Sequence, residues 1–508
     1  MKKMFNLLSI VENCRNSINI TFLVAVIFFF VAETFAQWQP DFRLTYNPAV
    51  SDLSRNNARC IAKSGDTIHV VWGDYRTAPA RRIYYKRSLN NGSTWEQDVE
   101  LTSHPAGSGF PSIAAVGSSV HVTYSDIRNG HLDIYYKYSS DNGLSWSPDI
   151  RLTTDPGDSR TSSLAVSGDI LHVAFLDNRG GNQKIFYKRS LDAGISWSDE
   201  IMISNSAVFL YDWINGPSIS ASSENVIIVW QDDHDGNLEI YSRCSSDYGD
   251  TWEAETRLTN NSSSSQNASV IMLNSSVNVV WQDNRDGNFE IYYMKSTDNG
   301  FTWSTETRLT DNNAASTYPS VAVSGETIHV FWQDYRDGNG EIYYKQSNDS
   351  GISWEADLRL TNDTHLSQYV FTAASDSVVH IVWQDNRDGN EEVYYKRKLI
   401  GSSVGIEDDD TNPPSEYELK QNYPNPFNPT TKIKFTIPSR TEYHSVPQIV
   451  TLKVYDVLGN EVATLVDEYL PAGSYEVEFD ASGLPSGIYF YKLKTGSFVE
   501  TKKMLVIR

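Results

Sequence analysis

Residues Pro319–Thr361 read PSVAVSGETIHVFWQDYRDGNGEIYYKQSNDSGISWEADLRLT, and close variants of this stretch recur along residues 41–400. Each copy has an aspartate at the end of its second strand-like run. Neighbouring aspartates are 51 to 55 residues apart. They occupy seven positions: Asp74, Asp126, Asp177, Asp232, Asp283, Asp334 and Asp385. Self-similarity at such a regular period indicates a repeat architecture.

Each unit contains four short strand-like runs. In Pro319–Thr361 these are SVAVSG, TIHVFWQD, EIYYKQS and a final run that ends in Arg-Leu-Thr. Alternation with a period of two, interrupted by Gly, Asn and Asp, is typical of antiparallel strands joined by tight turns. Four strands in about 40–50 residues describe one blade of a β-propeller. The sequence therefore predicts an all-β fold, with a seven-bladed β-propeller over residues 37–400.

The two ends of the array complement each other. The seventh unit stops after its third run, Tyr394–Lys396, and has no fourth run. A lone Arg43-Leu44-Thr45 stands before the first unit and matches the missing run. Pairing the two would close the ring and leave no open sheet edge. We therefore expect the N-terminal strand to complete the last blade.

Six units also carry the pattern Ser-x-Asp-x-Gly-x-Thr/Ser-Trp, as in Ser139–Trp146, with Asn90 replacing the aspartate in the first. The acidic side chain can accept hydrogen bonds from turn amides, and the glycine permits a positive φ. This pattern resembles the Asp box, the bacterial neuraminidase repeat of the sialidase superfamily, and it covers most of residues 41–400. Because the motif also occurs in propellers that are not sialidases, we interpret it as a folding element.

The resemblance to sialidases does not extend to their catalytic residues. That family carries an Arg-Ile-Pro motif near its start, three substrate-binding arginines, a Tyr/Glu nucleophile pair and an aspartic acid/base. No Arg-Ile-Pro occurs in this chain, and no catalytic residue is assigned from the family. Whether the protein is an enzyme is therefore left open; if it is one, an exo-sialidase-like glycosidase or a polysaccharide lyase is expected.

Residues that recur at one repeat position are interpreted as structural. Five units have a histidine where the fourth and fifth have Ile227 and Asn278, which argues against a metal or catalytic role. The run Asp283–Asn288 (DNRDGN) forms a natural tight turn. Calcium binding there is the alternative, but Arg285 stands where a calcium loop would place an oxygen ligand. We expect no cofactor and no metal, with calcium possible but not favoured.

The fourth unit departs most from the repeat. The link before it is four residues longer, and His234 replaces the arginine of its second turn. Aromatic rings stack on sugar faces, while polar groups bind hydroxyls. We therefore predict a glycan site on the face opposite the Asp boxes; alternatively, the longer link packs against its own blade. The predicted site comprises Tyr211, Asp212, Trp213, His234, Arg179 and Arg285, with further contributions from Asp158, Arg160, His104, His365 and Tyr369.

The two termini indicate export. Residues 1–36 combine basic residues, an apolar run and Thr34-Phe35-Ala36, as in a cleavable signal peptide; an uncleaved anchor is the alternative. Residues 401–416 are acidic and polar, which is typical of a linker. Residues 417–508 resemble a type IX secretion C-terminal sorting domain through YPNPFNP and LPSGIY. That resemblance implies a small immunoglobulin-like β-sandwich, type IX machinery as a partner, and a protein that is secreted or attached to the outer cell surface.

The composition excludes some partners. A net charge of −22 argues against nucleic acid, whose binding depends on clustered cations. Without the signal peptide only Cys60 and Cys244 remain, and we expect two buried thiols; a disulfide is the alternative. The favoured hypothesis is a propeller that binds an extracellular glycan or polysaccharide. A glycoside hydrolase or lyase is the first alternative, and a protein-binding adhesin is the second.

Overall fold

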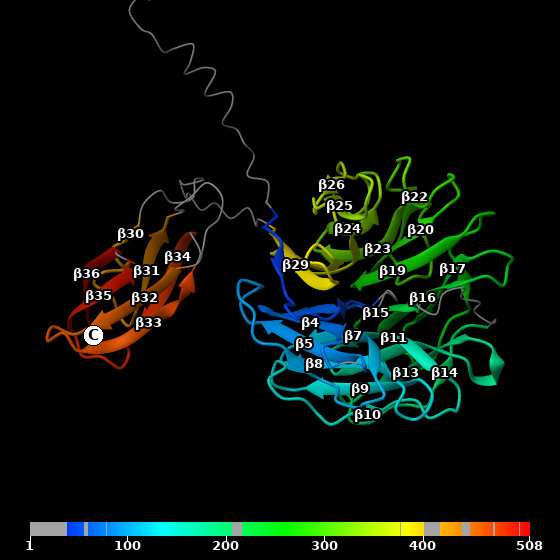
Figure 1. The fold of residues 1–508 in the computed structure, drawn as a ribbon, viewed down its shortest axis with the longest axis horizontal. Coiled ribbons are helices and arrows are strands. Elements are labelled where there is room, and N and C mark those ends of the chain that lie inside the picture. The colour runs from blue at the N-terminus through cyan, green and yellow to red at the C-terminus, as the bar shows by residue number, and fades with distance from the viewer. Residues whose placement is uncertain are drawn as a thin grey trace, which may run out of the picture. The chain divides into compact units, whose positions relative to one another are not determined.

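The computed structural model describes residues 38–507 apart from 55–58, 78, 206–215, 376, 401–416, 439–447, 471–472 and 497. The chain divides into two compact units, Met1–Ser402 and Ser403–Arg508 (Figure 1). Nearly all regular structure in the described part is β-strand; one 3₁₀ turn, Arg179–Gly181, is the exception. The predicted all-β class is therefore confirmed. The predicted signal peptide and linker lie outside the described residues and stay predictions.

The described residues of the first unit form seven antiparallel sheets. The first sheet contains β2 (Ser51–Asp52), β3 (Ile61–Ser64), β4 (Thr67–Asp74), β5 (Arg82–Ser88) and β6 (Val99–Glu100). The second contains β7 (Ser108–Val116), β8 (Ser119–Asp126), β9 (Asp133–Ser139) and β10 (Ile150–Arg151). The third contains β11 (Ser159–Ser167), β12 (Ile170–Asp177), β13 (Lys184–Ser190) and β14 (Ile201–Met202).

The remaining four sheets repeat this order. They contain β15 (Ser218–Ser222), β16 (Asn225–Asp232), β17 (Glu239–Ser245) and β18 (Thr256–Arg257); β19 (Ser265–Leu273), β20 (Ser276–Asp283), β21 (Glu290–Ser296) and β22 (Thr307–Arg308); β23 (Ser316–Ser324), β24 (Thr327–Asp334), β25 (Glu341–Ser347) and β26 (Leu358–Arg359); and β27 (Ser367–Ser375), β28 (Val378–Asp385), β29 (Glu392–Leu399) and β1 (Phe42–Arg43).

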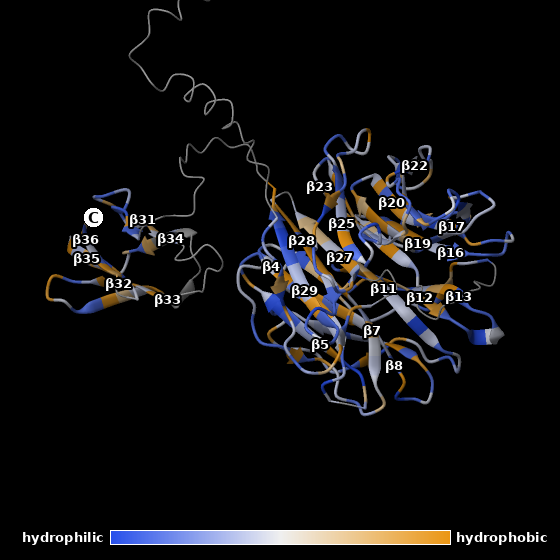
Figure 2. Ribbon diagram, turned by 45° about the horizontal axis from the view of Figure 1, so that its top comes forward, coloured by the Kyte–Doolittle hydropathy of each residue, from blue (hydrophilic) through white to orange (hydrophobic). Residues whose placement is uncertain are grey.

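The sheets follow one another around a central channel. Their inner strands make contact in the order β3, β7, β11, β15, β19, β23, β27 and back to β3. All seven inner strands line one central cavity of about 210 Å³. Figure 1 shows the colour running from blue at β4 through cyan and green to yellow at β29, and Figure 2 shows apolar residues on the strands with mostly hydrophilic loops around them. The unit is therefore a propeller-like ring of sheets.

The N-terminal strand β1 lies in the seventh sheet, where Phe42 pairs with Tyr395 and Arg43 with Tyr394. The buried carboxylate of Glu392 accepts hydrogen bonds from Arg43 Nη2 at 2.8 Å and from the Thr45 hydroxyl.

In the fifth sheet, the buried carboxylate of Glu290 makes the same contacts, with Arg308 Nη2 at 3.1 Å and with the Thr310 hydroxyl. The recurrence of Arg-Leu-Thr is thus explained: Arg and Thr fasten the outer strand to a buried glutamate, while the Leu side chain is buried.

The Asp boxes connect neighbouring sheets. The Nδ1 atom of buried His121 lies 2.7 Å from the hydroxyl of Tyr136 in the same sheet. Trp197, from the Asp box of the next sheet, packs edge-on against the Tyr136 ring at a centroid distance of 5.1 Å. At Gly194, which has a φ of +90°, a Cβ would lie only 2.1 Å from the same hydroxyl. The recurrent histidines and the Asp boxes are therefore structural, as predicted.

The second unit contains two sheets with a shared core. Its strands are β30 (Glu418–Leu419), β31 (Thr430–Ile437), β32 (Gln448–Tyr455), β33 (Glu461–Leu470), β34 (Gly473–Asp480), β35 (Gly487–Thr495) and β36 (Phe498–Val506). The sheet orders are β30-β31-β34 and β33-β32-β35-β36. Ile433, from the first sheet, and Leu452, Tyr491 and Met504, from the second, are buried in one cluster. This is a two-sheet β-sandwich; its likeness to an immunoglobulin domain stays a prediction. No helix in the described part of the chain is long and apolar enough to cross a membrane.

The two described cysteines are not joined to each other. Cys60 and Cys244 are both buried, and no disulfide joins them. Burial raises the pKa of the Cys60 thiol to about 12 and that of Cys244 to about 11. Thiols that remain protonated at neutral pH are poor nucleophiles and poor metal ligands. Both residues therefore act as small packed side chains, as expected.

Candidate functional site

The turns of the ring lie at two opposite ends of its strands. The Asp-box turns contact the first turn of their own sheet, as where Asn142 N donates to Ser118 O at 2.8 Å. The second-to-third strand turns instead contact the links between sheets, as where Asn178 N donates to Asp158 O at 3.1 Å. We call the latter end the link face. The inner strands begin there, and they end at the Asp-box face.

The predicted site on the fourth sheet is described only in part. Tyr211, Asp212 and Trp213 lie outside the described residues. His234 lies on the link face, with Nδ1 2.9 Å from Asp232 Oδ1 and its ring centroid 4.7 Å from that of Tyr241. In other sheets the arginine of the Asp-x-Arg turn contacts the equivalent aspartate and the equivalent aromatic ring. The imidazole of His234 therefore occupies the place of that guanidinium. A ligand-binding role for His234 stays a prediction.

The two predicted arginines make the contacts of the repeat. Arg285 hydrogen-bonds through Nε to buried Asp283 at 2.9 Å, pairs with Glu306, and lies over the Tyr292 ring at 4.5 Å from its centroid. Arg179 likewise bridges two carboxylates and lies over an aromatic ring. Within the described residues, no ion pair or hydrogen bond joins these two arginines to each other or to the predicted histidine.

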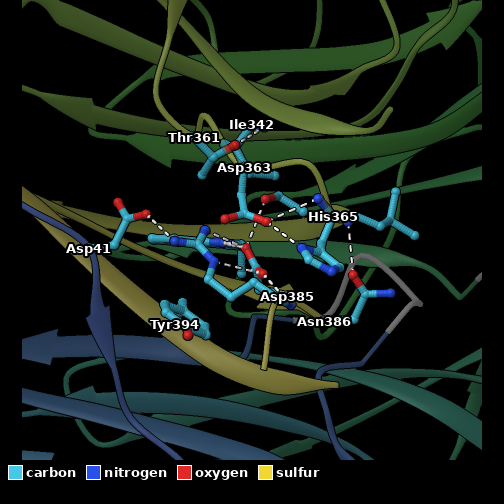
Figure 3. A network of polar contacts seen from close by, with 12 residues as sticks. Asp41, Ile342, Thr361, Asp363, His365, Asp385, Asn386 and Tyr394 are labelled. Atoms are coloured by element: carbon cyan, nitrogen blue, oxygen red, sulfur yellow. Dashed lines mark hydrogen bonds and ion pairs between the residues drawn. The ribbon is translucent and has the colours of Figure 1, made fainter. Parts of the chain in front are cut away.

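The seventh sheet has the same arrangement of polar contacts, part of which Figure 3 shows from close by. Arg387 contacts Asp385 at 2.6 Å and Asp41, just before β1, at 2.8 Å. The arginine of this motif thus connects the second strand of a sheet to the segment that leads into its outer strand. This recurrence indicates that the Asp-x-Arg turns hold each sheet together.

The inner strands show a feature that the sequence reasoning missed. Five of them contain a β-bulge near the link face, and one non-glycine residue in each bulge has a left-handed φ of 50–55°. Such values are uncommon outside glycine and are retained only where the surroundings impose them. The bulge residues are Phe110, Thr161, Asn267, Tyr318 and Tyr369.

Neighbouring sheets hold the bulges in place. The backbone N–H of Asn267 donates to Gln231 Oε1 of the preceding sheet at 2.9 Å. Tyr318 N donates in the same way to Gln282 Oε1, also at 2.9 Å. Because these hydrogen bonds come from the adjacent sheet, the side chains at the bulges are positioned by the ring as a whole.

A signal for the bulges exists in the sequence. Serines bracket them, as in Ser265–Ser269 and Ser316–Ser320, while the three residues between differ from unit to unit. Equivalent positions in the ring therefore carry different side chains around the channel mouth. Among these, the rings of Tyr318 and Tyr369 meet edge-on at a centroid distance of 4.9 Å. Only Tyr369 was among the residues that the sequence suggested.

Arg59 lies at the centre of this arrangement. It lines both the central channel and a narrow pocket toward the link face, which it shares with Tyr318 and Tyr369. Its Nη2 atom reaches from the first sheet to the fifth and donates to Val270 O at 3.0 Å. No described carboxylate lies within ion-pair distance of it. Burial without such a neighbour lowers the pKa of Arg59 to about 10, so the side chain remains charged at neutral pH.

Two acidic side chains on the link face have polar partners of their own. Asp52 pairs with Arg81 at 2.7 Å. Glu391 Oε1 accepts a hydrogen bond from Gln368 Nε2 at 3.3 Å. No group of three or more His, Cys, Asp or Glu side chains in the described part of the chain is arranged to hold a metal ion. The feature that distinguishes the mouth is therefore a half-buried cation beside aromatic rings.

Comparisons with protein families identify the two units. Residues 115–330 match the BNR repeat-like domain, and residues 421–507 match the secretion system C-terminal sorting domain. The chain thus combines a β-propeller-like unit that resembles BNR-repeat domains with a second unit that resembles a type IX secretion sorting domain. The sorting domain indicates a protein that is secreted or attached to the cell surface.

Solved structures resemble the chain only distantly. Polysaccharide lyase Uly1 is 11% identical, with 73% of this chain and 94% of that chain covered and a TM-score of 0.48. The endosialidase of phage phi92 is 11% identical over 92% and 87%, with a TM-score of 0.45. Trypanosoma rangeli sialidase is 12% identical over 80% and 86%, with a TM-score of 0.38. No curated protein matches the chain significantly. Likeness at this level carries no conclusion about activity.

Proposed function

We propose that this protein is a seven-bladed propeller, closed by β1, that binds an anionic extracellular glycan at the link-face mouth of its channel. The observation that carries the proposal is Arg59, a half-buried guanidinium with no carboxylate partner in the described part of the chain. A charge that is partly removed from water is stabilised by an opposite charge beside it. The unused donors of Arg59 therefore favour a ligand that supplies the missing negative charge.

The size of the pocket limits what enters it. Its volume is about 20 Å³, close to the space that one water molecule needs. One carboxylate oxygen fits there, whereas the rest of the sugar stays at the mouth. Tyr318 and Tyr369 line the pocket and can pack against the face of such a ring. Since the bulges are held by the neighbouring sheets, their side chains lose little conformational entropy on binding.

The predicted residues of the long link can extend this site. Gly216 follows the link directly, and a Cβ added there would lie 2.5 Å from the carbonyl oxygen of Thr161, a bulge residue. The link therefore ends at the channel mouth. Tyr211 and Trp213 remain predicted contacts for further units of a polymeric ligand, and the sorting domain supports presentation of this site outside the cell.

The proposal is tested with the full chain and four polymers. Alginate, hyaluronan and polysialic acid are anionic, and dextran is the neutral reference; binding is measured by isothermal titration calorimetry. At least one anionic polymer is expected to bind while dextran does not. Arg59→Gln is expected to weaken that binding at least tenfold. Lys63→Gln removes the same charge at the Asp-box end of the channel and is expected to have no effect.

Four results would count against the proposal. Equal binding of dextran, or unchanged affinity in Arg59→Gln, would show that no anion is recognised there. Release of reducing sugar ends would support the hydrolase or lyase alternative. Capture of one protein partner without any glycan binding would support the adhesin alternative.

A further inference from the structure

The interface between the fifth and sixth sheets differs from the others at the Asp-box face. Asn278 stands where five sheets have a buried histidine, and it accepts a hydrogen bond from the Tyr293 hydroxyl at 2.8 Å. The neighbouring position carries Lys295, whose Nζ donates to Ser350 O at 3.0 Å. In the first sheet Arg87 occupies that position, and its Nη1 donates to the equivalent Asp-box carbonyl at 2.6 Å. Both side chains of the fifth sheet are therefore shorter than their counterparts.

A pocket of about 220 Å³ opens at this place. Its walls come from the first turns of the fifth and sixth sheets and from the sixth Asp box. Leu273 and Ile328 supply apolar surface, while Asn274, Asn278, Lys295 and Glu326 supply hydrogen-bonding groups. The volume is below the ~300–1,000 Å³ of sites for drug-sized ligands, so one ring fits and an oligomer does not.

The chemistry of the lining indicates the kind of ligand. Amide and hydroxyl groups beside an apolar wall match the alternating faces and edges of a pyranose. Lys295 and Glu326 carry opposite charges, so the pocket has no net preference for an anion or a cation. Asn278 is 1% exposed, and its Oδ1 is occupied by Tyr293, which fixes its amide orientation.

We propose that this pocket is a second binding site, which takes a single neutral sugar residue on the face opposite the channel mouth. It shares no residue with the anion site at Arg59 and does not depend on it. A chain with both sites contacts an extracellular polysaccharide from two faces.

The repeat supplies a precise way to close the pocket. Asn278→His installs the residue that five other sheets accommodate beside the same tyrosine, so the fold is expected to tolerate it. The full chain is examined by saturation-transfer difference NMR with glucose, galactose, mannose and N-acetylglucosamine. At least one of these sugars is expected to bind the wild type, and Asn278→His is expected to weaken that binding at least tenfold. Arg59→Gln is expected to leave it unchanged.

Several results would overturn the proposal. They are the absence of binding by all four sugars, unchanged binding in Asn278→His, and stronger binding of glucuronic acid than of any neutral sugar. If Asn278→His fails to fold, Lys295→Arg carries the same expectation, because arginine occupies that position in the first sheet. Loss of sugar binding in Arg59→Gln would mean that the sugars bind at the channel mouth, which would also contradict the proposal.

Discussion

The outer part of the ring and the region around its axis are built from the same repeat, but the repeated residues recur more regularly in the outer part. Away from the axis, the Asp-x-Arg turns, the Asp boxes and the buried Glu of the Arg-Leu-Thr contact recur in most sheets with the same partners. At the channel mouth, the bulge residue changes from Phe110 to Thr161, Asn267 and Tyr318. A contact required wherever two sheets pack must recur. A residue that varies at an equivalent position is not required by that packing.

The largest effect is expected from a recurrent contact. Tyr136 is fully buried, its hydroxyl lies 2.7 Å from His121 Nδ1, and its ring packs against the edge-on ring of Trp197. Tyr136→Ala is expected to lower the free energy of unfolding by about 3–5 kcal/mol, as for other large aromatic-to-alanine changes in cores. Tyr138→Ala, two residues along on a partly exposed side chain, is expected to cost about 1 kcal/mol. Urea unfolding measures both; similar losses would show that the recurrent contact has no special weight.

The buried histidines predict acid sensitivity. Burial lowers the pKa of His69, His172, His329 and His380 to about 3, and that of His121 to about 4. The unfolded value is near 6.5, so the unfolded chain binds protons first as the pH falls. This stability is present above pH 6.5 and is lost progressively toward pH 3–4.

At pH 5 the loss is about 2 kcal/mol per histidine. Urea midpoints at pH 7.5 and pH 5 measure the difference. His172→Asn reproduces the Asn–Tyr pair of the fifth sheet. It is expected to reduce the loss of stability between pH 7.5 and pH 5 by the contribution of one histidine, about 2 kcal/mol. Equal stability of the wild type at the two pH values would contradict the assignment of these histidines as buried and neutral.

The smallest effect is expected at the axis. Arg59→Gln removes one hydrogen bond to Val270 but also a half-buried charge that has no carboxylate partner among the described residues. These effects oppose each other, so the free energy of unfolding is expected to change by less than about 1 kcal/mol. The matched change Arg285→Gln leaves buried Asp283 without its cation and is expected to cost about 3 kcal/mol. Comparable losses in the two variants would remove the distinction between axis and outer ring.

The sequence indicated the architecture better than it indicated the site. Strands, turns and the role of Arg-Leu-Thr follow from repetition, since each copy of a motif makes the same contacts. His234 was selected because it differs from the repeat, yet its partners Asp232 and Tyr241 are those of the repeat, so the structure gives it the place of the arginine. A change of residue type does not by itself free a side chain from a recurrent network.

Arg59 could not be located by pattern. It belongs to the first unit, where more residues separate the first serine, Ser51, from the inner strand β3 than in most other units. Its place on the axis depends on the ring, which brings the first sheet opposite the fifth. The bulges were also hidden, because alternation predicts an uninterrupted strand through Ser316–Ser324.

The most direct test is a crystal structure of the full chain with an acidic oligosaccharide, such as an alginate tetramer. We expect one carboxylate of the sugar within hydrogen-bond distance of the Arg59 guanidinium, with the ring against Tyr318 and Tyr369. Sugar bound only to the arginines of the Asp-x-Arg turns, with the channel mouth unoccupied at saturating ligand, would contradict the account.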